Sequence, residues 1–290
     1  MDICEAARAA GFDPVIALVG AEAELPYATV LLCFVTYEAE KAPSRQGAWI
    51  HPYYPASQLA YRAAAALEER FRQDGIDLRR HNEIRLKPLF ARLGQLRQGK
   101  NTLSYLPGVG SRFHVQVLAG NASAAEYTHL SPSPKPLMCG DCRRCEQACP
   151  TGAITGRGFV RERCLRNWQL GGAAVPEGLR AAMGNRLIGC DECQRSCPHN
   201  PPPTGPAGET VPLSWLLSSP KEAAQQLSPL IGSNLALPNR LAAQACLLAG
   251  CAERESLGEA LTALAAHPSA QVREHARWAL KQRAAGSDHE

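Results

Sequence analysis

Residues 139–154 read CGDCRRCEQACPTGAI, and residues 190–198 read CDECQRSCP. The first stretch has the spacing C-x2-C-x2-C-x3-C-P, which is typical of bacterial ferredoxins that bind iron-sulfur clusters. In this spacing three thiolates bind one cluster, and the fourth, which precedes a proline, binds a neighbouring cluster. The sequence therefore predicts two 4Fe-4S clusters whose ligands cross between the two stretches.

The cysteines needed for the second cluster lie downstream. Cys164 stands alone in RERCLRNW, and GCDECQRSCPHN adds three more. Because Cys197 also precedes a proline, we treat the two stretches as pseudo-symmetric. We assign one cluster to Cys139, Cys142, Cys145 and Cys197, and the other to Cys149, Cys164, Cys190 and Cys193.

Structural zinc is the alternative, because four cysteines in C-x2-C pairs also bind zinc. The triple run suits one tetrahedral ion poorly, so we favour clusters. The other four cysteines lie in apolar or helical surroundings, which is typical of small buried side chains. They are Cys4, Cys33, Cys246 and Cys251.

The composition is that of an ordinary globular protein, with 290 residues, 45% of them hydrophobic and 20% charged. The N-terminal stretch carries acids where a signal peptide needs basic residues, and no apolar run approaches the roughly 18 residues that span a bilayer. We expect a cytoplasmic protein without membrane attachment, in which 12 cysteines favour metal over disulfides. The net charge of +4 permits a nucleic-acid partner without requiring one.

We expect an α+β protein of three domains. Residues 1–130 form a mixed α/β domain, because VIALVG, ATVLLCFVTY and FHVQVLAG predict strands and SQLAYRAAAALEERFRQDG predicts an amphipathic helix. Residues 131–205 form a bacterial ferredoxin-like double-cluster domain. Residues 206–290 form a helical segment in which HPSAQVREHARWAL is typical of HEAT repeats. The proline-rich stretch PHNPPPTGPAGET predicts an extended, mobile linker between the last two domains.

The order of these parts resembles that of the epoxyqueuosine reductases, tRNA-modifying enzymes that share a corrinoid and double-cluster plan with reductive dehalogenases. The matching stretches are CGDCRRCEQACPTGAI, the lone Cys164, LIGCDECQRSCPHN, GKNTLSYLPGVGSRFHVQVL and HPSAQVREHARWAL. The resemblance implies a cobalamin held between the first two domains, with electrons from a ferredoxin or flavodoxin passing through the clusters to cobalt. The reduced cobalt would remove an epoxide oxygen from a nucleoside in a tRNA anticodon loop, giving queuosine. The HEAT-like end would help to hold the tRNA, and we expect a monomer.

A glycine-containing turn is the expected corrinoid contact, because its backbone N–H groups can cradle an anion or a corrinoid side chain. Its residues are Gly99, Lys100, Asn101, Thr102 and Tyr105. A plain loop is the alternative for this turn. A nucleotide-binding P-loop is disfavoured, because Asn101 stands where the magnesium-binding hydroxyl is needed.

The proton donor of the resembled family is an aspartate in a V-D-T motif before the G-K-N segment. Counting back from Gly99 places that position at Arg80 or its neighbours, so the nearest acids, Glu83 and Asp77, are the catalytic candidates. Two other hypotheses stay open. One is an electron-transfer protein without its own catalytic centre, and the other is a corrinoid-dependent reductase of a small molecule.

Two further groups carry open alternatives. The stretch HPYY at residues 51–54 either stacks a base or corrinoid or packs the start of a helix. Four basic residues of the last predicted helix form either a phosphate-binding stripe or a solvated charged face. They are Arg273, Arg277, Lys281 and Arg283.

Overall fold

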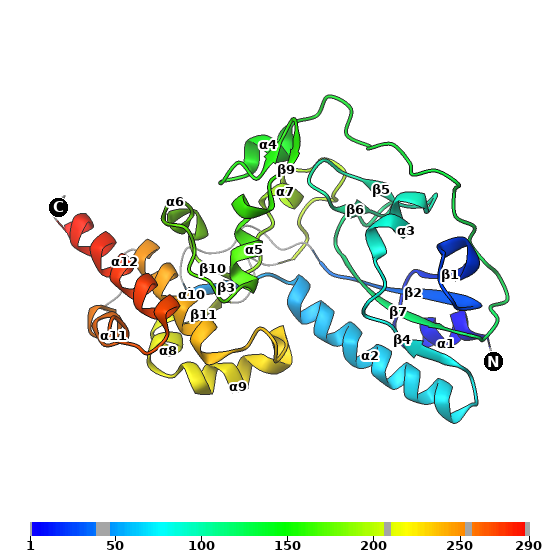
Figure 1. Ribbon diagram of the computed structural model, residues 1–290, viewed down its shortest axis with the longest axis horizontal. Helices are drawn as coiled ribbons and strands as arrows, with labels where there is room; N and C mark the ends of the chain where they lie inside the picture. The colour runs from blue at the N-terminus through cyan, green and yellow to red at the C-terminus, as the bar shows by residue number, and fades with distance from the viewer. Residues whose placement is uncertain (1, 39–46, 206–209, 253–256, 288–290) are drawn as a thin grey trace. The chain divides into compact units, whose positions relative to one another are not determined.

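The computed structural model describes residues 2–38, 47–205, 210–252 and 257–287 (Figure 1). The chain divides into two compact units. We call the first the sheet unit, which comprises Met1–Glu38, Pro55–Arg143 and Cys197–Pro202. The second, the helical unit, comprises Ala39–Tyr54, Arg144–Ser196 and Pro203–Glu290. The three domain boundaries expected from the sequence stay predictions, and residues 206–209 of the predicted linker lie outside the described residues.

The sheet unit contains a four-stranded sheet with helices on both faces. Its elements are α1 (Ile3–Ala9), β1 (Val15–Val19), η1 (Ala21–Ala23), β2 (Thr29–Thr36), α2 (Tyr53–Gln73, in this unit from Pro55), β4 (Leu78–Arg80), α3 (Leu86–Arg92), β5 (Arg97–Gln98), β6 (Ser104–Tyr105) and β7 (Phe113–Gly120). The strand order is β1-β2-β7-β4, and every neighbouring pair is antiparallel. The predicted strands and long helix are therefore confirmed. The antiparallel order refines the α/β description, because α/β folds have parallel strands.

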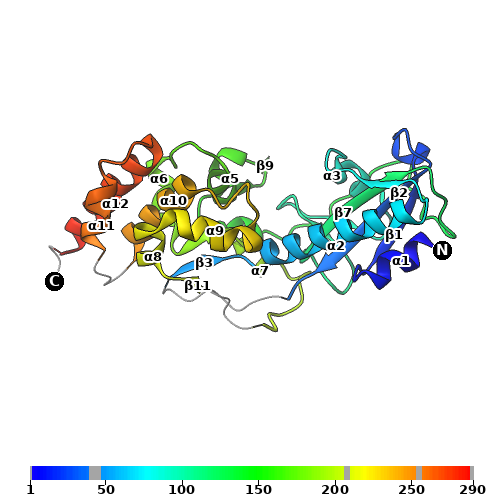
Figure 2. The same cartoon turned by 90° about the horizontal axis from the view of Figure 1, so that it is seen from below.

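The continuous apolar runs of β1 and β2 follow from burial on both faces of this sheet. Alternate residues point to opposite faces of a strand. Leu31 and Leu118 pack with α1 and α2, whereas Leu32 and Val117 pack with the region of α3. The long helix α2 runs along the sheet (Figures 1 and 2). A run such as VIALV is therefore apolar at every position, instead of alternating with polar residues as in a half-exposed strand.

The helical unit contains the C-terminal helices and a small sheet of order β10-β3-β11. Its elements are β3 (Ala48–Ile50), α4 (Arg144–Ala148), β8 (Ile154–Thr155), β9 (Gly158–Phe159), η2 (Arg161–Arg163), α5 (Leu165–Leu170), α6 (Glu177–Arg180), η3 (Ala181–Met183), β10 (Arg186–Ile188), α7 (Glu192–Arg195), β11 (Thr210–Val211), α8 (Leu213–Ser218), α9 (Pro220–Ile231), α10 (Pro238–Cys251), α11 (Gly258–Leu264) and α12 (Ala270–Ser287). Proline at the first position of α9 and α10 suits a helix start, where its missing N–H is not needed.

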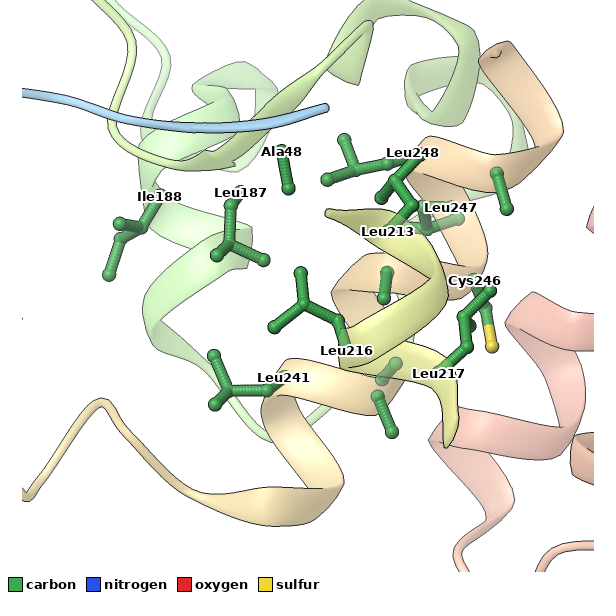
Figure 3. Close-up of a cluster of buried hydrophobic side chains, with 14 of the residues drawn as sticks. Ala48, Leu187, Ile188, Leu213, Leu216, Leu217, Leu241, Cys246, Leu247 and Leu248 are labelled. Atoms are coloured by element: carbon green, nitrogen blue, oxygen red, sulfur yellow. The ribbon is translucent and has the colours of Figure 1, made fainter. Parts of the chain in front are cut away.

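The core of the helical unit gathers around α10. Leu241, Leu247 and Leu248 of α10 pack with leucines of α8 and with Leu187 of β10 (Figure 3). The helical character expected for the C-terminal segment is confirmed by α10, α11 and α12, whereas the sequence analysis identified no helix at α8 or α9. The HEAT-like character of this end stays a prediction. Among the described residues, no helix is both long enough and apolar enough to cross a membrane.

A buried histidine joins α12 to the rest of this unit. His275 is fully buried, its Nε2 accepts the N–H of Val175 at 3.0 Å, and its Nδ1 donates to the carbonyl of Ala243 at 2.9 Å. Burial lowers the pKa of His275 to about 4, and the charge of Arg180 also lowers it. The imidazole is therefore neutral in the folded protein.

This histidine makes stability depend on pH. Because the unfolded chain binds this proton more readily, the contribution is complete above about pH 6.5 and is lost as the pH falls toward 4. We expect His275→Gln to reduce the pH slope of the unfolding free energy by up to about 1.4 kcal/mol per pH unit in that window. Urea unfolding between pH 4 and 7 measures it, with His267→Gln as the partly exposed control. Equal slopes for wild type and His275→Gln would contradict the expectation.

Candidate functional site

Five cysteines lie near one another in the helical unit. Burial raises the pKa of the Cys193 thiol, and the neighbouring Cys190, Cys164, Cys149 and Cys145 raise it further. The helices α4 and α7, which carry Cys145 and Cys193, also pack together. The fold thus brings together the four thiols assigned to the second cluster, although they are distant in sequence, and places Cys145 beside them.

The local backbone prepares Cys149 to act as a thiolate. The N–H of Ala153 donates to its Sγ at 3.2 Å, and the hydroxyl of Thr151 lies 3.6 Å from the same sulfur. Burial raises the pKa of the Cys149 thiol, but the hydrogen bonds from Thr151 and Ala153 outweigh it, and the net shift is downward. Metal-binding cysteines bind as thiolates, so these hydrogen bonds suit a cluster ligand.

The segment before Cys190 is fixed by close packing. Gly189 has φ +96°, and its N–H donates to Oε1 of Gln169 at 2.8 Å. A Cβ at Gly189 would lie 2.3 Å from the Cβ of His51, so a larger residue does not fit there. Tertiary contacts with residues far away in sequence therefore set the position of Cys190.

The HPYY stretch packs the start of α2. His51 accepts the N–H of Tyr53 at its Nδ1, at 3.1 Å, and burial together with the charge of Arg166 lowers its pKa to about 3. The guanidinium of Arg166 lies 5.4 Å from the ring centre of Tyr53 and 5.9 Å from that of Tyr54. Arg166 follows Cys164 by two residues, and the sequence analysis missed it because its aromatic partners precede it by more than a hundred residues.

The other three assigned ligands, Cys139, Cys142 and Cys197, belong to the sheet unit. The turn between β5 and β6 contacts their segment, because the backbone N–H of Lys100 donates to Sγ of Cys139 at 3.3 Å. In the same turn the amide of Asn101 donates to the hydroxyl of Tyr105 at 2.7 Å. The turn expected to hold a corrinoid is thus bound to the cysteine segment, and its corrinoid role stays a prediction.

The donor set fits two 4Fe-4S clusters. All 12 cysteines, each within a described range, are free thiols, and two assigned ligands already accept backbone N–H groups. Within the described ranges, no three histidine, cysteine, aspartate or glutamate side chains converge on the position of a single metal ion. A cluster instead needs its sulfurs spread over the corners of a cubane.

The candidate acids lie beyond opposite ends of β4. Asp77 precedes the strand and accepts the side-chain amide of Asn121 at 2.9 Å. Glu83 follows it, and its Oε1 lies 2.5 Å from Nδ1 of His81. The hydroxyl of Tyr27 lies 3.3 Å from the same nitrogen, so Glu83 is part of a cluster of three titratable side chains.

Arg80, which lies at or next to the position expected for the aspartate of the family pattern, has a structural role. Its Nε donates to Oε2 of Glu68 at 2.6 Å, and its guanidinium lies 5.0 Å from the ring centre of Tyr61. Both partners belong to α2, so Arg80 joins the edge strand β4 to that helix.

Only part of the expected basic stripe on α12 is exposed. Arg273 donates to the carbonyls of His267 and Pro268, and Arg283 donates to that of Ala249. The bonds of Arg273 fix the turn before α12, and the bond of Arg283 joins α12 to α10. Arg277 and Lys281 remain exposed. The stripe as a phosphate-binding surface stays a prediction.

Residues 138–200 match the family described as the 4Fe-4S double cluster binding domain. The chain is 31% identical to the epoxyqueuosine reductase of Alicycliphilus denitrificans over 225 residues, which are 67% of this chain and 58% of that protein. It is 36% identical to the epoxyqueuosine reductase of Listeria monocytogenes over 104 residues, or 36% of this chain and 26% of that protein. The chain thus spans less than two thirds of the length of these curated relatives.

Solved structures extend the likeness along the chain at the level of fold. One crystal structure of an epoxyqueuosine reductase matches 97% of this chain and 89% of its own, with a TM-score of 0.74 and 21% identity. The structure of an epoxyqueuosine reductase with a modified tRNA-Tyr stem loop matches 97% of this chain and 88% of its own chain, with a TM-score of 0.73 and 22% identity. The structure of a catabolic reductive dehalogenase matches 85% of this chain and 35% of its own chain, with a TM-score of 0.51 and 17% identity. The predicted resemblance to epoxyqueuosine reductases is confirmed.

Proposed function

We propose that this chain, which resembles epoxyqueuosine reductases in its cysteine segment and its fold, is a cytoplasmic oxidoreductase that reduces epoxyqueuosine in tRNA to queuosine. The reaction adds two electrons and two protons to the epoxide, and it releases the oxygen as water and leaves an alkene. The two clusters, when bound, supply single electrons received from a ferredoxin or flavodoxin. A cobalamin, when bound, supplies the cobalt centre at which the epoxide is reduced.

The observation that carries this proposal is the combination of a double-cluster segment with a fold match along 97% of the chain. A ferredoxin needs only the cysteine segment, whereas this chain also has the sheet unit and the C-terminal helices of the matched enzymes. A catalytic protein explains this additional fold better than an electron carrier does.

The pair of His81 and Glu83 is our proposed proton source. Nδ1 of His81 lies 2.5 Å from Oε1 of Glu83, and this hydrogen bond lowers the pKa of Glu83. Tyr27 contacts the same nitrogen and can pass a proton along. This pair would take over from the aspartate that the family pattern has at Arg80 or its neighbours. Asp77 is disfavoured, because it lies beyond the other end of β4, where it contacts Asn121 and Arg79.

Turnover of a tRNA anticodon stem loop that contains epoxyqueuosine tests both the proposed reductase activity and the proposed proton source. We expect anaerobically purified protein to hold about one cobalt per chain and to produce queuosine. Glu83→Gln should slow turnover about 100-fold, the usual contribution of one general acid-base group. Asp77→Asn is the matched control, and its turnover should stay near that of wild type. Nucleoside analysis by mass spectrometry and metal analysis provide the measurements.

The outcomes separate the alternatives. Iron without cobalt and without turnover would favour an electron-transfer protein. Cobalt without conversion of the stem loop would favour a reductase of a small molecule. Equal turnover by wild type and Glu83→Gln would refute the proton source but not the reductase.

A further inference from the structure

Lys100 binds the turn between Cys139 and Cys142, the first two assigned ligands, through both its backbone N–H and its side chain. The N–H of Lys100 donates to Sγ of Cys139 at 3.3 Å. Its Nζ donates to the carbonyl of Gly140 at 2.8 Å and to that of Cys142 at 3.1 Å. Lys100 therefore holds both the sulfur of one ligand and the backbone of the next.

The turn that presents Lys100 is itself rigid. The N–H of Thr102 donates to the carbonyl of Gly99 at 2.9 Å, and the buried Asn101 bonds to Tyr105 and to the N–H of Leu103. Thr102 has φ 64°, a left-handed conformation that is strained for a β-branched residue. Such a conformation persists only where the surroundings fix it, so the direction of the Lys100 N–H is determined before any cofactor binds.

A second turn of the sheet unit holds the segment of Cys197 in the same way. The N–H and hydroxyl of Ser111 donate to Oδ1 of Asn200 at 2.7 and 3.1 Å, and Arg112 donates to the carbonyl of Pro201 at 2.6 Å. Gly110 has φ +73°, and a Cβ there would lie 2.1 Å from Oδ1 of Asn200. The expectation of a mobile linker is therefore wrong for residues 200–201, whose polar groups are held by buried partners.

The same segment reaches its cysteine through one backbone bond. The N–H of Asn200 donates to the carbonyl of Cys197 at 3.1 Å. The ring centre of His199 lies 6.4 Å from that of Tyr105, which belongs to the first turn. The first turn therefore contacts Cys139 directly, and the second holds the residues that follow Cys197. Cys149 instead accepts the N–H of Ala153, and both residues lie in the helical unit.

We propose that the turn around Lys100 and the turn around Ser111 are a clamp for one cluster, and that Lys100 is a positioning residue that sets its retention and reduction potential. The N–H bond to sulfur and the nearby ammonium both stabilise the more negative reduced state, so they raise the potential. None of the hydrogen bonds described for the clamp reaches an assigned ligand of the other cluster, so we expect that cluster to be unaffected. This inference rests on the cluster part of the proposed function and on no part of its tRNA chemistry.

The test compares three variants of the full chain. Lys100→Met removes the ammonium but keeps the backbone N–H, Lys100→Arg keeps the charge, and Lys87→Met is a control on the exposed surface of α3. Iron and sulfide per chain are measured after a chelator challenge. Electron paramagnetic resonance during a redox titration gives the potential of each cluster.

We expect iron in Lys100→Met to fall from about eight toward about four per chain, with the potential of one cluster more negative and the other unchanged. Lys100→Arg and Lys87→Met should behave as wild type. Asn200→Ala, which removes the acceptor of Ser111 without touching Lys100, should weaken retention of the same cluster.

Two results overturn the clamp. They are unchanged iron and potentials in both Lys100→Met and Asn200→Ala, or an equal change in both clusters. A wild type with far fewer than about eight irons overturns the cluster assignment itself, and the clamp with it. The wild-type measurement therefore separates failure of the proposed function from failure of this inference.

Discussion

Cys193→Ala is expected to lower the iron content from about eight to about four per chain, because Cys193 is assigned to one complete cluster. Its neighbours Cys149, Cys164 and Cys190 are the other ligands assigned to that cluster. A cubane that has lost one thiolate exposes an iron to solvent and chelators. Metal analysis and the electron paramagnetic resonance signal of the reduced protein measure the loss.

Cys246→Ala is the matched control for this change. Cys246 is fully buried, but it lies in α10 among the leucines of the helical core (Figure 3). We expect this variant to keep about eight irons, with a loss of unfolding free energy on the order of 1 kcal/mol. Equal iron in both variants would refute the assignment of Cys193. Zinc in place of iron in the wild type would refute the clusters altogether.

Gly189→Ala is expected to destabilise the folded chain by about 2–4 kcal/mol, because strain and overpacking act together. Its φ of +96° disfavours any residue with a Cβ, and that Cβ would lie 2.3 Å from the Cβ of His51. The backbone at Gly189 cannot move freely, because Gln169 bonds to both its N–H and its carbonyl. The strain should also displace Cys190, so iron retention should fall with stability.

Gly178→Ala provides the control for the loss of a glycine. Gly178 lies in α6, and a Cβ there meets no atom within 4 Å. This variant should be neutral or more stable by up to about 1 kcal/mol, since alanine restricts the unfolded chain. Chemical unfolding of the iron-loaded protein compares the two. A Gly189→Ala variant within about 0.5 kcal/mol of wild type would contradict the packing argument.

Local patterns explain which elements the sequence predicted. The strands β1, β2 and β7 and the helix α2 follow from apolar runs and from helical spacing over many residues. The short helices α8 and α9 were missed, although Ala223, Leu227 and Ile231 share the buried face of α9. Pro229 inside α9 and a helix of only six residues before it weaken the pattern.

Contacts between residues that are far apart in the sequence could not be predicted from local patterns. Lys100 was predicted to lie in a loop that cradles a ligand, because G-K-N-T provides backbone N–H groups. Nothing in this motif indicates that the N–H of Lys100 donates to Cys139. Likewise, the proline-rich stretch has the composition of a linker, and only the bonds from Ser111 and Arg112 show that Asn200 and Pro201 are fixed.

The sequence by itself determined the metal chemistry, because cysteine spacing along the backbone limits how many thiolates can reach one cluster. It also determined the main strands and helices, since burial on one or two faces leaves a periodic trace in the chain. The tertiary structure alone decided which residues surround the cysteines. The contacts of Lys100 with Cys139, His51 with Gly189, and Ser111 with Asn200 each join distant segments, and no local pattern specifies such pairs.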